Sequence, residues 1–483
     1  MYSVENANKH IKLHKYNVIE RFKPQYHITA PIGWINDPNG FCYYKGEYHL
    51  FCQYYPYDQV WGTMHWGHWT SKDLVKWDWR GVALAPDKSF DNLGCFSGTA
   101  LVLDEKMYIM YTGVHKNEEG IVVQEQCLAI SDDGYTFNKY SNNPVVRSSD
   151  LPDGFSKTDF RDPKLLKTES GFRILVASSK DDVGKILSYK SQNLINWKFD
   201  KVFVDNISTM PECPDYYRLN NKDIFVTCLM NQPMQGLKYQ NDHHAVVYFI
   251  GEEKNGVLAL DKHHSIDLGQ DFYAPQTLIT PSGRAVMIAW MQMWGEAPAN
   301  YYLKHGWQGQ YTFPREITIK NNRIYQKPIK EIESLYKDTI EISSIKIKEK
   351  TSFDNVSGGV LRLQIEIINI TSNDVVVYFF ENKSSYIILK YERDSGILLL
   401  DRSNSYYPVL ALPDGDAKNI AKVQIDQYLD SLNLDVLLDT CSIEVFAENG
   451  KAALTSLVYP DESSDKISFK GEFTIEKLIL HRI

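Results

Sequence analysis

The sequence predicts an all-β protein in which a five-bladed β-propeller is followed by a C-terminal β-sandwich. Three observations lead to this fold class. Short strand-like runs between turns extend over nearly the whole chain, one segment recurs every 60 residues, and the composition changes near residue 336. Hydrophobic residues make up 43% of the 483 residues and aromatic residues 13%, which suits packed sheets better than disorder.

The strand pairs are clearest in the first 230 residues. "FCYYKGEYHLFCQYY" has two aromatic runs on either side of Lys45–Gly46, and "ALVLDEKMYIMYTGV" has two apolar runs around Asp104–Glu105–Lys106. "PKLLKTESGFRILVASS" and "DYYRLNNKDIFVTCLM" follow the same plan. These patterns predict antiparallel hairpins. No segment keeps a long apolar period of about 3.6 residues, so we expect few and short helices.

An internal repeat relates these hairpins. "SKDLVKW" begins at Ser71, "SDDGYTF" at Ser131 and "SQNLINW" at Ser191, and each combines a serine, polar residues, a turn and an aromatic residue. A fixed period that carries about four strands is typical of sheets repeated around an axis, as in a β-propeller. The region from about residue 22 to about residue 330 has room for roughly five such units.

The character of the chain changes after "YTFPREITI". "KPIKEIESLYKDTIEISSIKIKEK" is charged, and no Trp follows it. Beyond it, "VLRLQIEII", "DVVVYFF", "LNLDVLLD" and "CSIEVFAENGKAALTSLVY" alternate between apolar and polar residues, with Asp-Gly and Asn-Gly turns. This pattern favours an antiparallel sandwich. We therefore predict a propeller domain over 1–335 with a short N-terminal extension, a linker over 336–344 and a sandwich over 345–483.

Composition excludes several classes of function. The net charge of −9 argues against a nucleic-acid partner, which needs a concentrated basic surface. The N-terminal residues resemble no signal peptide, and no run approaches about 18 apolar residues, so we expect a cytoplasmic protein without membrane contact. The seven Cys form no CxxC pair, and no ligand spacing indicates a metal. We expect neither metal nor other cofactor, and the sequence predicts no particular oligomeric state.

Three acidic tripeptides are the candidates for chemistry: Asn36–Asp37–Pro38, Arg161–Asp162–Pro163 and Pro211–Glu212–Cys213. Proline restricts the backbone of the residue before it, and a rigid backbone suits a preorganised carboxylate. Each tripeptide alone is ordinary turn material. All three precede strand pairs in different units, however, and such positions converge on the axis of a propeller.

Converging carboxylates among many aromatic residues point to glycoside hydrolysis, which uses one carboxylate as nucleophile and one protonated acid. The apolar neighbours of Glu212 favour a protonated general acid, whereas the amides beside Asp37 favour an ionised nucleophile. Arg161 is expected to hold its neighbour Asp162 ionised and oriented. These roles are hypotheses at this point.

The motifs "WINDPNG", "FRDP" and "ECPDY", about 125 and 50 residues apart, resemble those of the β-fructofuranosidases of glycoside hydrolase family 32. The resemblance continues through "VWGTMHWGHWTSKDLVKW", "GCFSGTA", "DFYAPQT", "AWMQMW" and "CSIEVFAENGKAALTSLVYP", so it covers nearly the whole chain. The family's fold is a five-bladed propeller joined to a sandwich.

The resemblance implies Asp37 as nucleophile, Glu212 as general acid/base and Asp162 as the transition-state stabiliser, in a retaining reaction through a fructosyl-enzyme. The residues that it implies at the fructose subsite are Asn36, Gln53, Trp61, Phe96, Ser97, Arg161 and Tyr273, together with one Trp of "AWMQMW", for which we prefer Trp290 over Trp294.

The expected substrates are sucrose, sucrose 6-phosphate and short fructo-oligosaccharides, and "KGEYHLFCQYYP" followed by "MHWGH" resembles the bacterial sucrose-6-phosphate hydrolase branch. A phosphate would need basic partners, for which the sequence offers Lys238, His243, Lys304 and His305. Two alternatives stay within the family, a fructosyltransferase and a fructan exo-hydrolase. A third is a non-catalytic carbohydrate-binding propeller.

Overall fold

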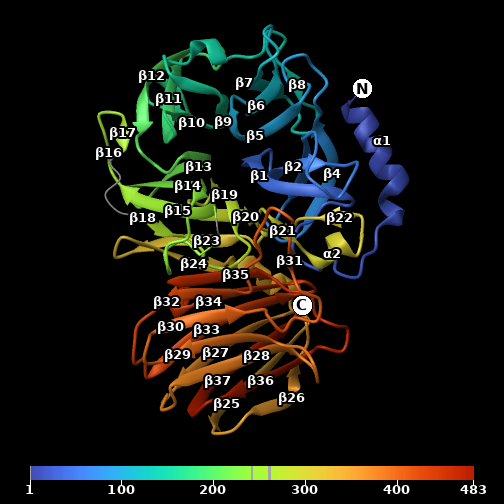
Figure 1. Cartoon of the computed structure of the whole chain (residues 1–483), viewed down its shortest axis with the longest axis vertical. Coiled ribbons are helices and arrows are strands. Elements are labelled where there is room, and N and C mark those ends of the chain that lie inside the picture. Colours follow the sequence, from blue (N-terminus) through green and yellow to red (C-terminus); the bar gives the residue numbers. More distant parts are fainter. Residues whose placement is uncertain (1, 241–242, 259–262) are drawn as a thin grey trace.

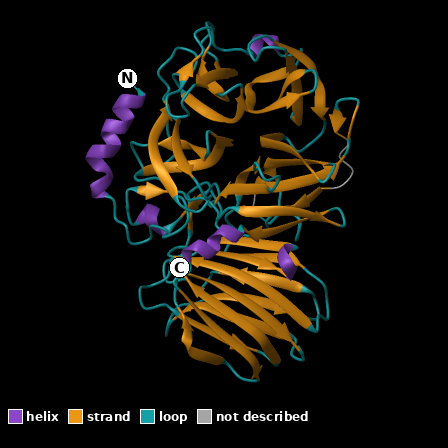
Figure 2. Ribbon diagram, turned by 180° about the vertical axis from the view of Figure 1, so that it is seen from behind, coloured by secondary structure: helices purple, strands orange, loops and turns teal. Residues whose placement is uncertain are grey.

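The computed structural model describes residues 2–240, 243–258 and 263–483, except the side chain of His243, and strands dominate it (Figures 1 and 2). The prediction of an all-β protein is confirmed. The helices are α1 (Val4–His14) and α2 (Ala299–Tyr302), with short 3-10 turns at η1 (Lys15–Asn17), η2 (Ser148–Asp150), η3 (Lys330–Leu335) and η4 (Glu448–Gly450). Among the described residues, none of these helices is long and apolar enough to cross a membrane.

The N-terminal part of the chain folds into antiparallel sheets of about four strands each, formed from consecutive segments. The first contains β1 (Gly33–Tyr44), β2 (Glu47–Tyr55), β3 (His65–Ser71) and β4 (Trp77–Leu84), with β22 (Trp307–Gln308) parallel to β1. The second contains β5 (Gly94–Leu103), β6 (Lys106–Lys116), β7 (Val122–Ser131) and β8 (Asn138–Lys139). The third contains β9 (Phe155–Thr168), β10 (Gly171–Lys180), β11 (Val183–Ser191) and β12 (Trp197–Val204).

Two further sheets complete this part. The fourth contains β13 (Met210–Leu219), β14 (Lys222–Gln232), β15 (His243–Gly251) and β18 (His263–Ser265), beside the small pair β16 (Glu253–Lys254) and β17 (Val257–Leu258). The fifth contains β19 (Tyr273–Ile279), β20 (Ala285–Trp290), β23 (Arg315–Lys320) and β24 (Arg323–Pro328). The first strands are neighbours in the order β1, β5, β9, β13, β19, and β19 lies again beside β1 (Figure 1).

The 60-residue repeat forms one recurring turn between the third and fourth strands of the first three sheets. The hydroxyl of Ser71 accepts a hydrogen bond from the backbone N–H of Leu74 at 2.8 Å, and Ser131 does the same for Gly134 at 2.8 Å. In the third sheet, Ser191 accepts from the N–H of Asn193 at 3.1 Å. Serine side chains stabilise such turns because they replace the backbone partners that the strands no longer supply.

The C-terminal part is a sandwich of two six-stranded sheets. One sheet has the order β25 (Asp338–Ile347), β37 (Phe473–Arg482), β27 (Leu361–Ile368), β33 (Ser431–Asp439), β34 (Ser442–Ala447), β35 (Ala452–Leu457). The other has the order β26 (Thr351–Ser357), β36 (Lys466–Lys470), β28 (Asp374–Glu381), β29 (Ile387–Glu392), β30 (Ile397–Asp401), β32 (Ile420–Gln424). Alternate side chains of the strands, such as Leu361, Leu363 and Ile365, enter one apolar core between the sheets.

The segment 336–344, predicted as a linker, is largely strand. β25 begins at Asp338 and pairs in register with β37 along its length. It is an edge strand of its sheet, and most of its side chains are exposed or only half-buried. Charged residues are common on edge strands because they discourage pairing with other chains. The charge that suggested a linker therefore belongs to the exposed edge of the second domain.

Buried ion pairs join the two parts of the chain. The ring of His27 lies between two carboxylates of the sandwich, with Nδ1 2.7 Å from Asp439 Oδ2 and Nε2 2.8 Å from Glu444 Oε1. Glu444 also accepts hydrogen bonds from the guanidinium of Arg315 in β23. All of these side chains are buried. The sandwich and the N-terminal sheets are thus connected by charges that water does not reach.

The His27 pair predicts how stability depends on pH. Burial disfavours the charged ring, but the hydrogen bonds and charges of Asp439 and Glu444 outweigh it and raise the pKa of His27 from 6.5 to about 9. A raised pKa stabilises the fold by about 3 kcal/mol below pH 6.5, and this contribution is lost as the pH rises through about 9. We expect the urea midpoint of the wild type to decrease as the pH rises from 6.5 to about 9. The midpoint of His27→Gln should decrease much less over the same range. Parallel pH profiles for the two proteins would contradict this account.

Candidate active site

The first strand of each N-terminal sheet carries a β-bulge, with one residue more than its partner strand. The extra residues lie at Asn36–Asp37 in β1, Ser97 in β5, Asp162–Pro163 in β9, Cys213–Pro214 in β13 and Ala274–Pro275 in β19. Bulges interrupt the alternation of a strand and redirect side chains. In three of them the residue before proline has a left-handed backbone, with φ of 63° at Asp162, 46° at Cys213 and 49° at Ala274.

These bulges surround a cavity of about 360 Å³. Its lining contains all three predicted carboxylates and most of the predicted subsite residues: Asn36, Asp37, Gln53, Trp61, Phe96, Ser97, Gln124, Arg161, Asp162, Glu212, Met230, His244 and Trp294. The inner strands of the first four sheets thus bring together residues that lie as far as 176 positions apart, from Asn36 to Glu212. Convergent polar groups in a concave site are typical of a catalytic centre.

Asp37 is held by hydrogen bonds to both of its carboxylate oxygens. The hydroxyl of Ser97 donates to Oδ2 at 2.5 Å, and the amide of Asn36 donates to Oδ1 at 3.1 Å. Trp34 Nε1 donates to Asn36 Oδ1 at 2.8 Å, which directs the Asn36 amide nitrogen toward Asp37. The backbone carbonyls of Asn36 and Asp37 both accept hydrogen bonds from the hydroxyl of Tyr311. The carboxylate is therefore fixed in orientation before any substrate binds.

Cys213 lies between Asp37 and Asp162. Its backbone N–H donates to Asp162 Oδ2 at 2.9 Å, and its thiol Sγ lies 3.3 Å from Asp37 Oδ2 and 3.7 Å from Asp162 Oδ2. The backbone N–H of Asp162 donates to Thr112 Oγ1 at 3.0 Å. The bulge of β13 thus sets the position of Asp162 as well as that of Glu212. A cysteine nucleophile is normally activated by a neighbouring base such as histidine. The Cys213 thiol lies instead between two carboxyl groups, which fits a packing role.

Glu212 has a different environment from the one that the sequence suggested. Its Oε1 accepts hydrogen bonds from Nε and Nη2 of Arg161, at 3.2 and 3.0 Å, and its Oε2 accepts from the hydroxyl of Tyr273 at 2.7 Å. The prediction of an apolar setting for Glu212 is therefore wrong. The hydrogen bonds of Arg161 go to Glu212 and Asp159 and not to Asp162, although its charge still favours the ionised form of Asp162. The bulge at Asp162 turns the two neighbours apart, so that the guanidinium reaches across to β13 instead.

Both aspartates of the site have raised pKa values. Burial raises the pKa of Asp37, and the charge of Glu212 raises it further, against the hydrogen bonds from Ser97 and Asn36. Burial also raises the pKa of Asp162, which Arg161 opposes and the charges of Glu212 and Asp37 reinforce. Burial, which excludes water, and like charge act in the same direction at both aspartates. Asp37 and Asp162 therefore bind a proton more readily than exposed aspartates do.

The aromatic residues predicted for the subsite occupy different depths. Trp61 is 48% exposed at the rim, with its ring edge toward Phe96 and 6.0 Å between the ring centroids. Gln53 is buried, and its amide nitrogen donates to the carbonyl of Cys95 at 3.0 Å. Tyr273 lies behind the cavity wall and contributes through Glu212. Planar rings at the rim suit the apolar faces of sugars.

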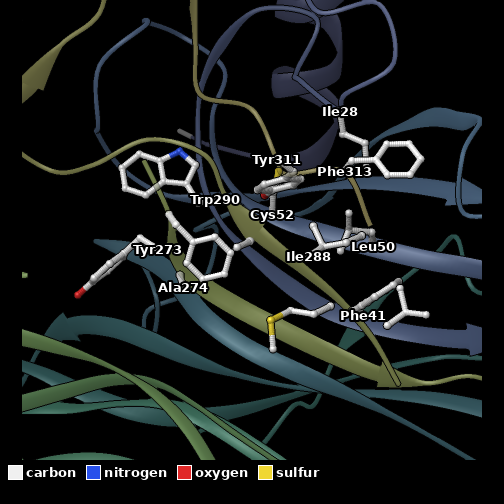
Figure 3. Close-up of a cluster of buried hydrophobic side chains, with 14 of the residues drawn as sticks. Ile28, Phe41, Leu50, Cys52, Tyr273, Ala274, Ile288, Trp290, Tyr311 and Phe313 are labelled. Carbon is white, nitrogen blue, oxygen red and sulfur yellow. The ribbon is translucent and has the colours of Figure 1, made fainter. Parts of the chain in front are cut away.

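The preference for Trp290 over Trp294 is reversed by the structure. Trp294 lines the cavity, stacked on Trp34 with 5.9 Å between the ring centroids. Trp290 is completely buried and lies beside Tyr273 and Tyr311 in the apolar cluster behind the site (Figure 3). Trp290 ends the regular strand β20, whose side chains are all buried, whereas Trp294 follows in the loop that reaches the cavity.

The proposed phosphate partners do not gather at this cavity. Lys238 lines a separate groove next to the sandwich, Lys304 is exposed beside α2, and His305 is buried against Phe22. The side chain of His243 lies outside the described part of the structure. Among the described lining residues, Arg161 and His244 are the basic ones, and Arg161 is already paired with Glu212 and Asp159.

Three lining residues were missed by sequence reasoning: Gln124, Met230 and His244. Gln124 Oε1 accepts hydrogen bonds from the backbone N–H of Phe160 and from Arg161, which links β7 to the site. Met230 and His244 are paired in register at the loop end of the β14–β15 hairpin. Met230 and His244 could have been found from the order of the strands. The end of the second strand and the start of the third strand of a sheet lie near the bulge of the first strand.

Comparison with known proteins agrees with this geometry. Residues 27–328 match the model of the glycosyl hydrolases family 32 N-terminal domain, and residues 331–479 match that of the family 32 C terminal. The chain belongs to glycoside hydrolase family 32. It is therefore a glycosidase, and its two matched regions divide between the N-terminal sheets and the sandwich.

Relatives of this family 32 enzyme cover nearly its whole length. A "probable sucrose-6-phosphate hydrolase" of Psychromonas ingrahamii is 35% identical, over 94% of this chain and 80% of that protein. A raffinose invertase of Escherichia coli is 32% identical, over 92% of this chain and 91% of that protein.

Solved structures of the family show the same fold. The β-fructofuranosidase of Bombyx mori, determined in complex with sucrose, has a TM-score of 0.83 at 30% identity and covers 99% of this chain and 97% of its own. The sucrose-6-phosphate hydrolase of Lactobacillus gasseri has a TM-score of 0.86 at 25% identity and covers 100% of this chain and 99% of its own.

Proposed function

We propose that this family 32 glycosidase hydrolyses terminal, non-reducing β-D-fructofuranosides and retains the configuration of the fructosyl group. The observation that carries the proposal is the convergence of Asp37, Asp162 and Glu212 in one cavity, with rigid partners for each carboxyl group. A retaining glycosidase needs a carboxylate nucleophile and a second carboxyl group about 5–5.5 Å away. The relatives that act on sucrose, its phosphate and raffinose support the same substrate class.

In the first step Asp37 attacks the anomeric carbon, C2 of the fructosyl unit, while Glu212 gives its proton to the leaving glycosidic oxygen. The bond from C2 to that oxygen breaks as the bond from C2 to Asp37 forms. Ser97 and Asn36 hold the attacking carboxylate in place. Asp162 accepts hydrogen bonds from sugar hydroxyls and stabilises the positive charge that develops on the ring.

In the second step water attacks C2 and releases Asp37, and Glu212 takes the proton from that water. The ion pair of Glu212 with Arg161 stabilises the carboxylate that the first step leaves behind, so Glu212 is ionised and can act as the base when water enters. The hydroxyl of Tyr273 orients the other oxygen of Glu212. Gln53, Trp61, Phe96 and Trp294 would bind the fructosyl ring and the group behind it.

The architecture that supports this site is, in our proposal, a five-bladed propeller over residues 1–335. Each sheet would be one blade, and the closed order of neighbours β1, β5, β9, β13 and β19 would place the bulged strands around the axis. The boundary at residue 335 follows the sequence prediction. The second domain would begin with β25 at Asp338, earlier than the predicted residue 345, because β25 pairs with β37.

We propose that the substrate is sucrose, sucrose 6-phosphate or a short fructo-oligosaccharide. We also propose that the enzyme is cytoplasmic. The experiment compares fructose release from sucrose, sucrose 6-phosphate, raffinose, kestose and inulin at one enzyme concentration. Release of fructose from the small sugars, faster than from inulin, is expected. A marked preference for inulin would replace the proposal by a fructan exo-hydrolase, and oligomers longer than the substrate would replace it by a fructosyltransferase.

A further inference from the structure

Arg402 is a sandwich residue that contacts the two segments behind the active site. It follows strand β30, is 1% exposed, and belongs to the C-terminal domain by sequence. Its Nη1 donates to Asp271 Oδ2 at 2.5 Å, and its Nη2 donates to Glu296 Oε1 at 2.6 Å. Both carboxyl groups are buried. One guanidinium therefore joins two separate segments of the N-terminal domain, and its planar fork suits such a task.

The first of these segments leads to the partner of the general acid. Asp271 stands two residues before Tyr273, whose hydroxyl donates to Glu212 at 2.7 Å. The segment lies along the sandwich strand β35, with backbone hydrogen bonds from Leu268 to Ala453 and from Asp271 to Thr455. A Cβ atom on Gly269 would lie 2.0 Å from the backbone nitrogen of Thr455, so the two chains are in direct contact.

The second segment leads to the aromatic wall of the cavity. Glu296 stands two residues after Trp294, which lines the site. Glu296 and Ala297 form β21 and pair with β31 (Leu410–Ala411) of the sandwich, and the carbonyl of Gly295 accepts a hydrogen bond from Leu412 at 2.8 Å. The loop with Trp294 is thus tied to the C-terminal domain directly after Trp294.

The charges of this group are balanced. Burial raises the pKa of Glu296 well above its usual range, and the charge of Asp271 raises it further, although Arg402 opposes this. When Glu296 is protonated, the positive charge of Arg402 is matched by the one negative charge of Asp271. A buried group of this kind holds its partners in one geometry, because any displacement leaves a charge unpaired.

From these contacts we infer that Arg402 is a positioning residue for the hydrolysis, acting through Asp271 on Tyr273 and through Glu296 on Trp294. The sandwich would then serve catalysis directly, since it fixes the orientation of Glu212 and the shape of the substrate wall. This inference rests on the proposed function, because it assigns Arg402 to the same reaction. It extends that function to a residue more than 100 positions from the nearest lining residue, Trp294.

The test compares Arg402→Lys with Asp439→Asn, which breaks a different buried ion pair between the two domains. The wild type must first release fructose, because its failure to do so would refute the proposed function and not this inference. Both variants are assayed at a temperature at which circular dichroism shows each to be folded. We expect kcat to fall about 10-fold in Arg402→Lys, since small displacements of catalytic groups are costly, and to stay within about 2-fold in Asp439→Asn.

The effect of Arg402→Lys is also measured in a second variant, which distinguishes positioning of Tyr273 from a general destabilisation of the fold. In Tyr273→Phe, which lacks the hydrogen bond to Glu212, Arg402→Lys should lower kcat no more than about 2-fold further. An equal loss of kcat in both backgrounds, or a loss in Asp439→Asn as large as in Arg402→Lys, would overturn the inference. If Arg402→Lys does not fold, Glu296→Ala decides. It should raise KM several-fold in the wild type but not in Trp294→Ala, and an unchanged KM in the wild type would overturn the inference as well.

Discussion

Replacing Asp37 by asparagine is expected to lower fructose release from sucrose by at least about 10⁴-fold, because the fructosyl group then lacks the carboxylate that attacks it. The amide is nearly the same size, and the hydrogen-bond donors Ser97 and Asn36 remain. We therefore expect the fold and the thermal midpoint to be kept. Burial already raises the pKa of Asp37, so loss of its charge costs little stability. Initial rates with sucrose and a thermal melt measure both effects.

The matched control is Asp58→Asn. Asp58 is exposed on the loop after β2 and accepts a hydrogen bond from the backbone N–H of Gln59. This variant should keep full activity. Activity of Asp37→Asn within about 10-fold of the wild type would remove Asp37 from the role of nucleophile and require another attacking group.

The change Glu212→Gln has the second largest expected effect, about 10³-fold on sucrose. The leaving group of sucrose is the poorly acidic hydroxyl of glucose, which needs a proton from Glu212. An aryl fructofuranoside has a good leaving group and needs much less help, so its first turnover, seen as a burst of aryl alcohol, should be slowed far less. Release of fructose and of the aryl alcohol, measured side by side in wild type and variant, gives the two ratios.

Tyr273→Phe serves as the control for this comparison, since it removes only the hydrogen bond to Glu212 Oε2. It should cost less than Glu212→Gln on both substrates. Equal losses in Glu212→Gln with good and poor leaving groups would show that Glu212 does not donate the proton.

The overall fold could be predicted because its signals are local. Ser71, Ser131 and Ser191 recur at a fixed period, and each hydroxyl forms the same turn between two strands. Hairpin turns such as Lys45–Gly46 interrupt apolar runs in a way that a single sequence displays. The boundary near residue 336 was less accessible, because the same charged residues suit a linker or an exposed edge strand such as β25.

The carboxylates could also be predicted, since proline follows Asp37 and Asp162 and flanks the segment of Glu212. Their partners could not. Arg161 forms hydrogen bonds with Glu212 and not with its neighbour Asp162, because the bulge in β9 redirects the chain, and the bulge is a property of the pairing with β10. Likewise, Trp290 is buried because it belongs to β20, whereas Trp294 follows the end of that strand. The sequence does not show where β20 ends. Proline after Ala274 repeats the pattern seen after Asp37 and Asp162, and this signal could have marked β19 as a fifth bulged strand.

The central claim is that Asp37 forms a covalent bond with fructose. Mixing Glu212→Gln with an aryl fructofuranoside allows the first step and slows the second, so the intermediate accumulates. Mass spectrometry of the quenched protein should show the added mass of one fructosyl unit, and digestion should place it on the peptide that contains Asp37. An unmodified protein that still releases the aryl alcohol, or a fructosyl group on another residue, would contradict the account.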